Sequence, residues 1–329
     1  MQIEISVVIP TFNRPESLRR LLSSLEIQKF TPKEVIIVDA SDETIRIEGI
    51  QLLFPTLNIS HIITIPSVCK QRNIGIRMSK SNYVFLCDDD IEVSADYLFR
   101  VVTYLLENPA AGIVTGWVLD KKAEGWNHQY DQTSFLGFVW NFIFQLTVWT
   151  DLSKVKSNLF TRPIIHLLQI FYANRGNTFT LAGWPLITSF KGEVIQTTFY
   201  TLSACIANKE WVMDVPFDEK LSANGIGENY GITALLPYKQ PIHILNGVFV
   251  YHHHELANRL KLVASYQLRI FALHYFMTKS YRFNRGNIVF LYWSLLGNLI
   301  WQLCKLKMEM ARATLKTITM LLLGRNPYK

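Results

Sequence analysis

Three consecutive aspartates, Asp88, Asp89 and Asp90, are the residues of the sequence best suited to chemistry. They follow the apolar segment 83–87, which is typical of a buried strand. Adjacent carboxylates repel one another unless a cation or strong hydrogen-bond donors compensate. Oxygen ligands of this kind suit Mg²⁺ or Mn²⁺, and such an ion can also bind a nucleotide diphosphate. The triplet therefore indicates a divalent metal site. The alternative is a solvated acidic turn before a helix that begins near Ala95.

The segments around the aspartates alternate between short apolar strands and helices. The strands are predicted at 5–9, 35–38, 61–65 and 83–86, and the helices at 16–25 and 70–78. This alternation predicts a doubly wound α/β sheet. Ligands of such sheets lie beyond the carboxyl ends of the strands. We therefore expect the loops after Ile9, Val38 and Leu86 to converge on one site.

Composition and apolar patterning predict contact with an anionic membrane surface. The 329 residues are 49% hydrophobic, with a mean hydropathy of +0.15 and a formal charge of +7. This apolar richness favours lipid as a partner. Nucleic acid is not expected as a partner. Residues 132–150 and 286–304 each form a run of 19 residues without a charge. Both are borderline for crossing a bilayer, so we expect them in the interface, with core helices as the alternative. A basic amphipathic helix over 256–281 is expected to lie on the bilayer.

Cysteine usage and the first residues of the chain favour the cytoplasmic face of a membrane. Segment 1–10 has no basic region followed by a long apolar run, so no secretory signal is predicted. The four cysteines lack the spacing of a zinc site or a disulfide framework, so we expect them to be reduced. They are Cys69, Cys87, Cys205 and Cys304. The expected attachment is peripheral or monotopic, with crossing by residues 286–304 as the alternative.

Several segments, in order and spacing, resemble the family 2 glycosyltransferases. They read SVVIPTFNRPESLRRLLSSL, EVIIVDASDE and KQRNIGIRMSKSNYVFLCDDDIEVSADYL, followed more loosely by LSACIANKEWVMDVPFDEKLSANGIGENYGI and VFVYHHH. The resemblance is close over residues 3–119 and ends near residue 254. It implies a GT-A fold, with a doubly wound mixed sheet flanked by helices. It also implies an inverting transfer from a sugar nucleotide, with Mn²⁺ or Mg²⁺ as cofactor.

The resemblance implies a set of residues that bind the nucleotide-diphosphate sugar. They are Pro10, Thr11, Asn13 and Arg14 in the first loop, Asp39 at the base, Lys70, Arg72 and Asn73 at the diphosphate, and Asp88 and Asp89 near the ribose and metal. Basic side chains offset the charge of a pyrophosphate, and arginine can bind it with two hydrogen bonds. Ala40 stands where many members of the family carry a second aspartate. Outside this context, the basic residues would indicate a solvated helix face and Asp39 a turn.

The resemblance also implies a catalytic base, for which Glu228 is the predicted residue. The family commonly shows a Glu-Asp pair here, whereas this chain has Glu228 followed by Asn229, and an amide cannot accept the proton. Asp218 is the rival for the base, or a residue that binds the acceptor. Without the family context, Glu228 would be an exposed glutamate in a glycine-rich loop.

Asp90 and His252 are the metal ligands that the resemblance implies, with Asp89 and His254 as alternatives. Imidazole is a competent ligand for Mn²⁺. Alternation along a strand places His252 and His254 on one side and His253 on the other. A surface tract of histidines is the alternative interpretation.

These features predict a GT-A domain over residues 1–255 and a helical, membrane-associated region over 256–329. Residues 1–119 would bind the nucleotide, and residues 120–255 would form the acceptor half with an apolar insertion. The expected function is transfer of a sugar to a hydroxyl of a surface glycan or a lipid-linked acceptor. A nucleotidyltransferase and a non-catalytic, membrane-bound adaptor of the same fold are the alternatives.

Overall fold

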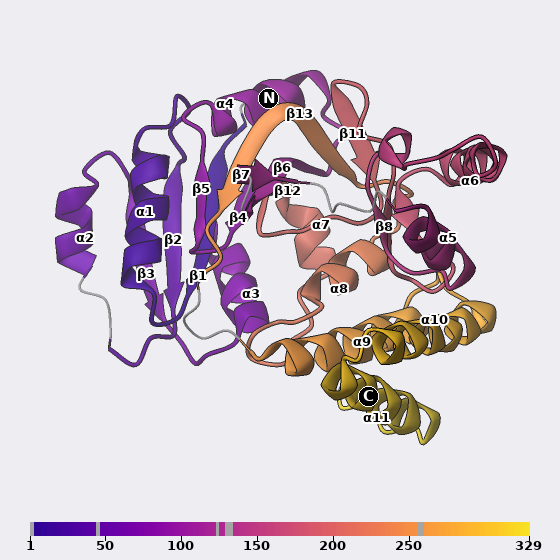
Figure 1. Cartoon of the computed structure of the whole chain (residues 1–329). Helices are drawn as coiled ribbons and strands as arrows, with labels where there is room; N and C mark the ends of the chain where they lie inside the picture. The colour runs from indigo at the N-terminus through magenta and orange to yellow at the C-terminus, as the bar shows by residue number, and fades with distance from the viewer. Residues whose placement is uncertain (1–2, 44–46, 123–124, 129–133, 256–259) are drawn as a thin grey trace.

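The structure is a computed structural model that describes residues 3–43, 47–122, 125–128, 134–255 and 260–329. A mixed sheet lies at its centre, with helices on both faces and a helical layer along one side (Figure 1). Within the described residues the main sheet contains β1 (Ile5–Thr11), β2 (Glu34–Asp39), β3 (Ile59–Ile63), β4 (Tyr83–Cys87), β5 (Ile91–Val93), β6 (Ile113–Lys122), β7 (Gly125–Asn127), β11 (Val194–Thr197), β12 (Ala204–Asn208) and β13 (Ile242–His252). A small sheet contains β8 (Val148–Trp149), β9 (Thr178–Phe179) and β10 (Pro185–Ile187).

The order of the main path is β11-β13-β6-β12-β4-β1-β2-β3. Strands β4, β1, β2 and β3 run parallel, and β12 enters antiparallel between β4 and β6. The helices are α1 (Pro15–Glu26), α2 (Ile47–Leu53), α3 (Val68–Met78), α4 (Tyr97–Glu107), α5 (Phe135–Ile143), α6 (Arg162–Arg175), α7 (Lys209–Asp214), α8 (Glu228–Leu235), α9 (Leu262–Lys279), α10 (Arg285–Cys304) and α11 (Met308–Leu322). The predicted mixed α/β sheet is confirmed.

The nucleotide-binding half folds as its apolar periodicity predicts. Strands β1, β2 and β4 are buried along their full length, as expected of parallel strands covered on both faces. Leu18, Leu21, Leu22 and Leu25 of α1 are all buried, which confirms the predicted apolar stripe. The boundaries differ from the prediction by at most two residues. Strand β3 occupies 59–63, and α4 begins at Tyr97.

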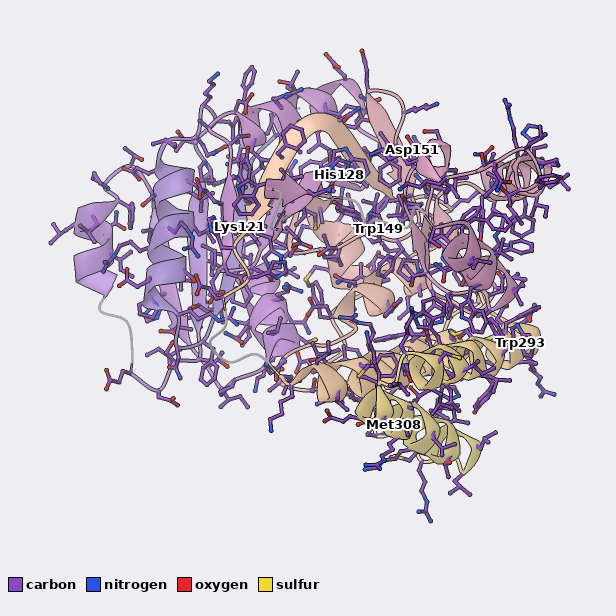
Figure 2. All side chains as sticks on the ribbon, viewed as in Figure 1. Lys121, His128, Trp149, Asp151, Trp293 and Met308 are labelled. Carbon is purple, nitrogen blue, oxygen red and sulfur yellow. The ribbon has the colours of Figure 1, made fainter. Side chains whose placement is uncertain are left out.

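The apolar run 132–150 does not form one membrane-crossing helix. Its residues 132–133 lie outside the described residues, and the remainder divides into α5 and β8. Phe138 of α5 is fully buried in a small core with α6 and β10. Gly297 lets α5 approach α10, because a Cβ there would lie 2.3 Å from Cγ of Phe144. Figure 2 shows side chains filling the space between these two helices near Trp293.

The prediction that residues 256–281 form a basic helix on the membrane surface is wrong, because the apolar residues of this segment pack in the protein core. Residues 256–259 lie outside the described residues, and α9 begins only at Leu262. Its apolar residues Ile270, Leu273 and Met277 are buried in the main hydrophobic core together with residues of β12 and α8. Amphipathic periodicity is the same whether the apolar face meets a bilayer or a protein core, so the sequence pattern could not distinguish them. The main core therefore extends across the predicted boundary at residue 255.

Replacing Leu273 by alanine tests whether this core is shared. Its side chain is 1% exposed, and Leu→Ala changes at such sites cost about 2–5 kcal/mol. We expect the whole protein to lose that stability in a single unfolding transition, measured by denaturant titration with far-UV circular dichroism and tryptophan fluorescence. Two separate transitions, with only one of them shifted, would show that the C-terminal helices fold independently.

Candidate active site

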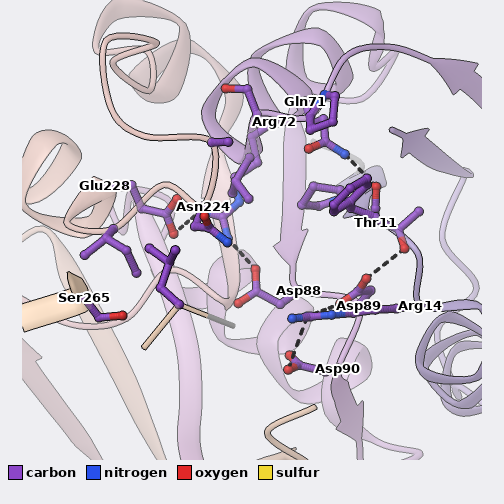
Figure 3. A pocket seen from close by; sticks show the side chains of 18 of the residues that line it. Thr11, Arg14, Gln71, Arg72, Asp88, Asp89, Asp90, Asn224, Glu228 and Ser265 are labelled. Atoms are coloured by element: carbon purple, nitrogen blue, oxygen red, sulfur yellow. Dashed lines mark hydrogen bonds and ion pairs between the residues drawn. The ribbon is translucent and has the colours of Figure 1, made fainter. Parts of the chain in front are cut away.

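A cavity of about 690 Å³ opens at the carboxyl ends of β1 and β4. Its walls come from the loop after β1, the start of α3, the three aspartates, the loop before α8, the end of β13 and the start of α9 (Figure 3). The lining includes Pro10, Thr11, Arg14, Gln71, Arg72, Asp88, Asp89, Asp90, Asn224, Glu228 and His252. The loops after β1 and β4 thus converge as predicted, because parallel strands end at one edge of a sheet.

Each of the three aspartates pairs with at least one cationic side chain, and Arg14 contacts both Asp89 and Asp90. Arg72 pairs with Asp88, and Arg14 Nη1 lies 3.1 Å from Asp89 Oδ1. His252 Nε2 lies 3.3 Å from Asp90 Oδ1. The predicted repulsion within the triplet is therefore offset by strong donors from the protein itself. The sequence could not show this, because Arg14, Arg72 and His252 come from distant segments.

Burial and hydrogen bonding shift the pKa values of Asp89 and Asp90 in opposite directions. Burial raises the pKa of Asp89 to about 7, against the lowering influence of Arg14 and of the Thr11 hydroxyl, which donates at 2.8 Å. Burial also acts to raise the pKa of Asp90, but His252 outweighs it and lowers the pKa well below its usual range. Asp90 thus keeps its charge, which suits a carboxylate that binds a cation.

Glu228 lies on the opposite wall of the cavity, paired with Arg72. Arg72 is buried, and its Nη1 lies 2.5 Å from Glu228 Oε1. Among the described residues, Glu228 Oε2 has no hydrogen-bond partner. A Cβ at Gly225 would lie 2.5 Å from that oxygen, so the glycine leaves room for it. Burial raises the pKa of Glu228 to about 7 despite the lowering influence of Arg72. A carboxylate with this pKa and one unpaired oxygen fits a general base.

Asp218, the predicted rival, lies apart from the lining residues. Its Oδ2 accepts hydrogen bonds at 2.8 Å from Tyr275 and from Lys279, both on α9. Burial opposes the change, but the hydrogen bond from Lys279 lowers the pKa of Asp218, which makes it a weaker proton acceptor. Asn229 follows Glu228 but turns its amide oxygen to the backbone N–H of Leu202 at 3.0 Å.

Four of the residues predicted to bind the donor are absent from the cavity lining described in the structure: Asn13, Asp39, Lys70 and Asn73. Asp39 ends β2 and lies 3.1 Å from His61 Nε2, while its other oxygen accepts from the N–H of Ser41. Asn73 is buried, and its amide group binds both the C=O and the N–H of Phe217. Asn73 therefore holds the loop before α8 in place. The donor contacts of these four residues stay predictions.

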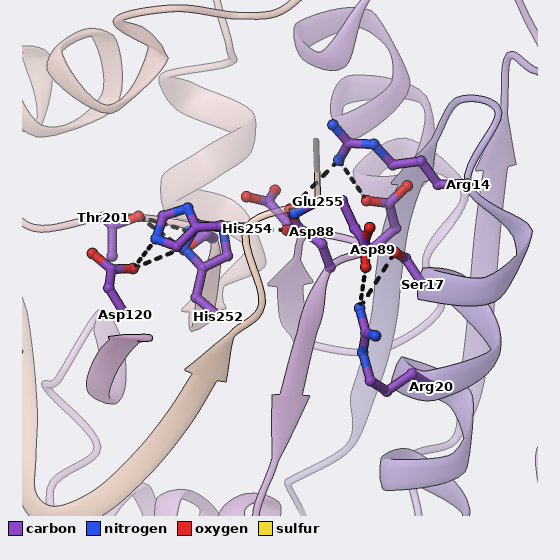
Figure 4. Close-up of polar contacts among 12 residues, drawn as sticks. Arg14, Ser17, Arg20, Asp88, Asp89, Asp120, Thr201, His252, His254 and Glu255 are labelled. Carbon is purple, nitrogen blue, oxygen red and sulfur yellow. Dashed lines mark hydrogen bonds and ion pairs between the residues drawn. The ribbon is translucent and has the colours of Figure 1, made fainter. Parts of the chain in front are cut away.

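Asp120 is a site residue that sequence reasoning missed. It lies at the end of β6 and pairs in register with His252 on the parallel strand β13. Its Oδ1 lies 3.0 Å from His252 Nδ1 and 2.6 Å from His254 Nε2 (Figure 4). His253 turns to the other side, toward Glu92. The alternation predicted for the three histidines is therefore observed. The signal for Asp120 was the strand register, which a single sequence does not show.

Asp90 and His252 fit a hard divalent cation. One carboxylate oxygen and one imidazole nitrogen face each other from two strand ends, and both residues line the cavity. Mn²⁺ accepts this mixture of donors, and Mg²⁺ accepts the carboxylate. Asp120, His252 and His254 also place one potential ligand atom each within 4.8 Å of one another. Asp120 and His254 are not among the lining residues, so this second set lies beside the cavity and shares His252 with the first.

A mixed sheet with an acidic triplet at the end of a central strand is characteristic of a GT-A fold protein. Two crystal structures of S. aureus TarS 1–349 share this fold. One has a TM-score of 0.51 at 16% identity, over 90% of this chain and 72% of that chain. The other, described as a complex with UDP-GlcNAc, has a TM-score of 0.54 at 14% identity, over 96% of this chain and 82% of that chain.

Residues 6–158, just under half of the chain, match the sequence model "Glycosyl transferase family 2", so this part of the chain is a domain of that type. An uncharacterized glycosyltransferase, YwdF, of Bacillus subtilis is 34% identical over 91 residues, which are 27% of this chain and 33% of that protein. The poly(ribitol-phosphate) beta-N-acetylglucosaminyltransferase TarP of Staphylococcus aureus is 30% identical over 129 residues, which are 36% of this chain and 38% of that protein. The matched part thus spans about a third of the length of these curated relatives.

Proposed function

We propose that the chain is an inverting, metal-dependent glycosyltransferase that transfers a sugar from a nucleotide-diphosphate sugar to a hydroxyl of a surface glycan or a lipid-linked acceptor. The observation that carries this proposal is the position of Glu228. A carboxylate with raised pKa and an unpaired oxygen lies in the same cavity as the acidic triplet. The fold neighbour in complex with UDP-GlcNAc and the name of the TarP relative support this type of donor and acceptor.

The side chains of the cavity divide between the two substrates. Arg14, Arg72 and Asp88 lie where a nucleotide diphosphate would reach the ends of β1 and β4. Glu228 accepts the proton of the acceptor hydroxyl, and the hydroxyl oxygen attacks the anomeric carbon from the face opposite the leaving group, which inverts its configuration. Arg72 keeps Glu228 in place by pairing with its other oxygen.

Asp90 and His252 would hold Mn²⁺ or Mg²⁺ at the donor side of the cavity. A divalent ion there would stabilise the negative charge of the departing nucleotide diphosphate as a Lewis acid. A GT-A neighbour supports the metal: the structure of GalNAc-T7 with UDP, GalNAc and Mn2+ has a TM-score of 0.51 at 13% identity, over 82% of this chain and 47% of that chain.

The enzyme would work on the cytoplasmic face of a membrane, where lipid-linked acceptors are assembled from cytosolic nucleotide sugars. Within the part of the chain that the structure describes, one helix, α10, is long and apolar enough to cross a membrane. A glycan acceptor that is anchored in lipid needs the enzyme at the surface. The net charge of +7 favours anionic headgroups.

Titration of the full-length protein with UDP, GDP and dTDP, each with and without Mn²⁺, tests the proposed donor class. We expect one of the three diphosphates to bind at least ~10-fold more tightly in the presence of Mn²⁺, measured by isothermal calorimetry. We also expect slow Mn²⁺-dependent hydrolysis of the matching UDP-, GDP- or dTDP-sugar in the absence of acceptor. Binding without any hydrolysis would favour the adaptor. No binding of any diphosphate would refute the proposal.

A further inference from the structure

Helix α10 exposes an apolar stripe along its whole length. Val289, Trp293, Leu296 and Leu303 are exposed and recur every three, four or seven residues, so they share one face. Val289 is 67% exposed. Only 28% of the most apolar stretch of this helix is buried inside the protein. Its opposite face, with Leu291 and Leu295, packs in the main core. The helix is therefore fixed to the protein on one side and apolar toward solvent on the other.

Helix α6 carries a second exposed apolar stripe that the sequence patterns did not reveal. Phe160, immediately before the helix, is 86% exposed, and Ile164, Leu167 and Ile170 continue the same face at helical spacing. The opposite face, with Ile165 and Leu168 among its residues, packs against Phe138 of α5. Side chains of this size seldom point into water in a row on a soluble surface.

The two helices that carry the stripes lie on one side of the molecule. Helix α5 lies between α6 and α10, and the three helices lie together on the side away from α2 (Figure 1). Trp293 of α10 donates a hydrogen bond to the C=O of Ile143, the last residue of α5, at 2.8 Å. Ile143 is itself exposed. Phe144 stacks on Trp293 with ring centroids 4.8 Å apart. The exposed surface of α5 therefore joins that of α10.

Positive charge is concentrated in the same two parts of the chain. Residues 154–175 and 282–307, which include α6 and α10, contain 8 of the 33 lysines and arginines and none of the 26 acidic residues, so they carry a formal charge of +8. The other residues together carry −1, given the net charge of +7. Arg162 is the first residue of α6, and Lys305 and Lys307 follow α10. Apolar stripes bordered by cations match the chemistry of an anionic bilayer surface.

We propose that the exposed faces of α5, α6 and α10 form a membrane-binding surface that inserts into the headgroup layer of an anionic bilayer. The proposal deepens the membrane location proposed above and rests on it, but it does not depend on the reaction. The proposal also explains how a lipid-linked acceptor in the bilayer could reach the cavity. Helix α9 supplies Ser265 and Arg269 to the cavity wall and packs directly against α10 and α11. The cavity is thus one helix away from the proposed surface.

We test this surface by measuring how variants with two substituted exposed residues bind to lipid vesicles. One variant is Phe160→Ser with Leu167→Ser on α6, and a second is Val289→Ser with Leu303→Ser on α10. The matched control is Leu52→Ser with Leu53→Ser on α2, because Leu52 is 83% exposed on the other side of the molecule. Full-length proteins are mixed with sucrose-loaded vesicles of phosphatidylcholine alone or with added phosphatidylglycerol, and bound protein is measured by sedimentation.

We expect the unmodified protein to bind the phosphatidylglycerol vesicles at least ~10-fold more tightly than neutral vesicles. Each of the α6 and α10 pairs should weaken binding by ~10-fold or more, since binding strength scales with the apolar area that inserts and each pair removes two apolar side chains from it. The α2 pair should bind like the unmodified protein. Circular dichroism and nucleoside diphosphate binding, measured on the same preparations, should be unchanged in all variants.

Three results would overturn the proposed surface. The first is no binding of the unmodified protein to either type of vesicle. The second is unchanged binding by both the α6 and the α10 pairs. The third is an oligomer of the unmodified protein that these pairs convert to a monomer, which would show that a second copy covers the surface. Nucleoside diphosphate binding reports separately on the proposed reaction. If the unmodified protein binds no nucleoside diphosphate, the proposed enzymatic function is refuted, but the proposed membrane-binding surface is not.

Discussion

Replacing Glu228 by glutamine is expected to lower turnover with an acceptor by ~10²-fold or more, while the affinity for the nucleotide sugar stays close to that of the unmodified enzyme. The amide keeps the shape of the side chain but cannot take up a proton, and general-base catalysis contributes ~10²–10⁴ in rate. The lost interaction acts in the transition state, so kcat falls and donor binding does not. Steady-state rates with calorimetric donor affinities measure the two quantities separately.

The dependence of the rate on pH gives a second readout of the same variant. Glu228 works as a base only when ionised, and burial raises its pKa from the usual 4.5 to about 7. The rate of the unmodified enzyme should therefore fall about tenfold per pH unit below pH 7 and level off above it. In the glutamine variant the residual rate should lose this dependence. If the rate of the glutamine variant still falls below pH 7, this pH dependence belongs to a group other than Glu228.

Asp218→Asn is the matched control for the base. Asp218 is held by Tyr275 and Lys279 on α9, and its lowered pKa disfavours proton uptake near neutral pH. We expect this variant to retain most of its turnover. If Asp218→Asn shows the large fall in kcat and Glu228→Gln does not, the two roles must be exchanged.

The strand ends of the site were predictable from sequence, because local signals determine them. A largely β-branched run followed by Pro10, and the apolar run 83–87 followed by Asp88, mark the carboxyl ends of two buried parallel strands to within two residues. Parallel strands end at the same edge of the sheet, so Thr11 and Asp89 had to lie close together. They are joined by a hydrogen bond of 2.8 Å.

Contacts between segments that lie far apart in the sequence were not predictable from the residues alone. The ion pair of Arg72 with Glu228 joins α3 to α8, and the pair of Asp120 with His252 depends on the register of β6 against β13. Neither the packing of helices nor the register of non-adjacent strands leaves a trace in a single sequence. The family resemblance supplied Glu228 and His252, but it did not supply Asp120.

For helix α9 the sequence carried a clear local signal, but the prediction from it was wrong because the same pattern fits two environments. Its apolar positions and interleaved cations fit a membrane surface as well as a protein core. The structure buries Ile270 and Leu273 in the core. The exposed stripe lies instead on α10, which lacks charged residues between Gly286 and Cys304 and so has no amphipathic pattern to detect. Composition alone predicted membrane contact, whereas the helix that we propose for it could be chosen only once the packing was known.

Asp90→Asn is expected to reduce the affinity of the full-length protein for Mn²⁺ by roughly 100-fold or more. The amide removes the charged oxygen that faces His252 Nε2 at 3.3 Å. Calorimetry or the electron paramagnetic resonance signal of free Mn²⁺, with nucleoside diphosphate present, measures this affinity without turnover. The fold should be retained, because Arg14 remains paired with Asp89 at 3.1 Å.

Asp120→Asn and His254→Ala decide which set of ligands holds the metal. If Asp90 and His252 Nε2 hold it, Asp120 acts by accepting the Nδ1 hydrogen of His252 at 3.0 Å, which orients the ring and leaves Nε2 free to bind. Asp120→Asn should then weaken Mn²⁺ binding only ~10–100-fold, as is typical of a supporting carboxylate. His254→Ala should have little effect, since its contact is with Asp120 and not with the cavity. If Asp120, His252 and His254 together hold the metal, Asp120→Asn and His254→Ala should both exceed the effect of Asp90→Asn, and that order of affinities would refute the assignment to Asp90.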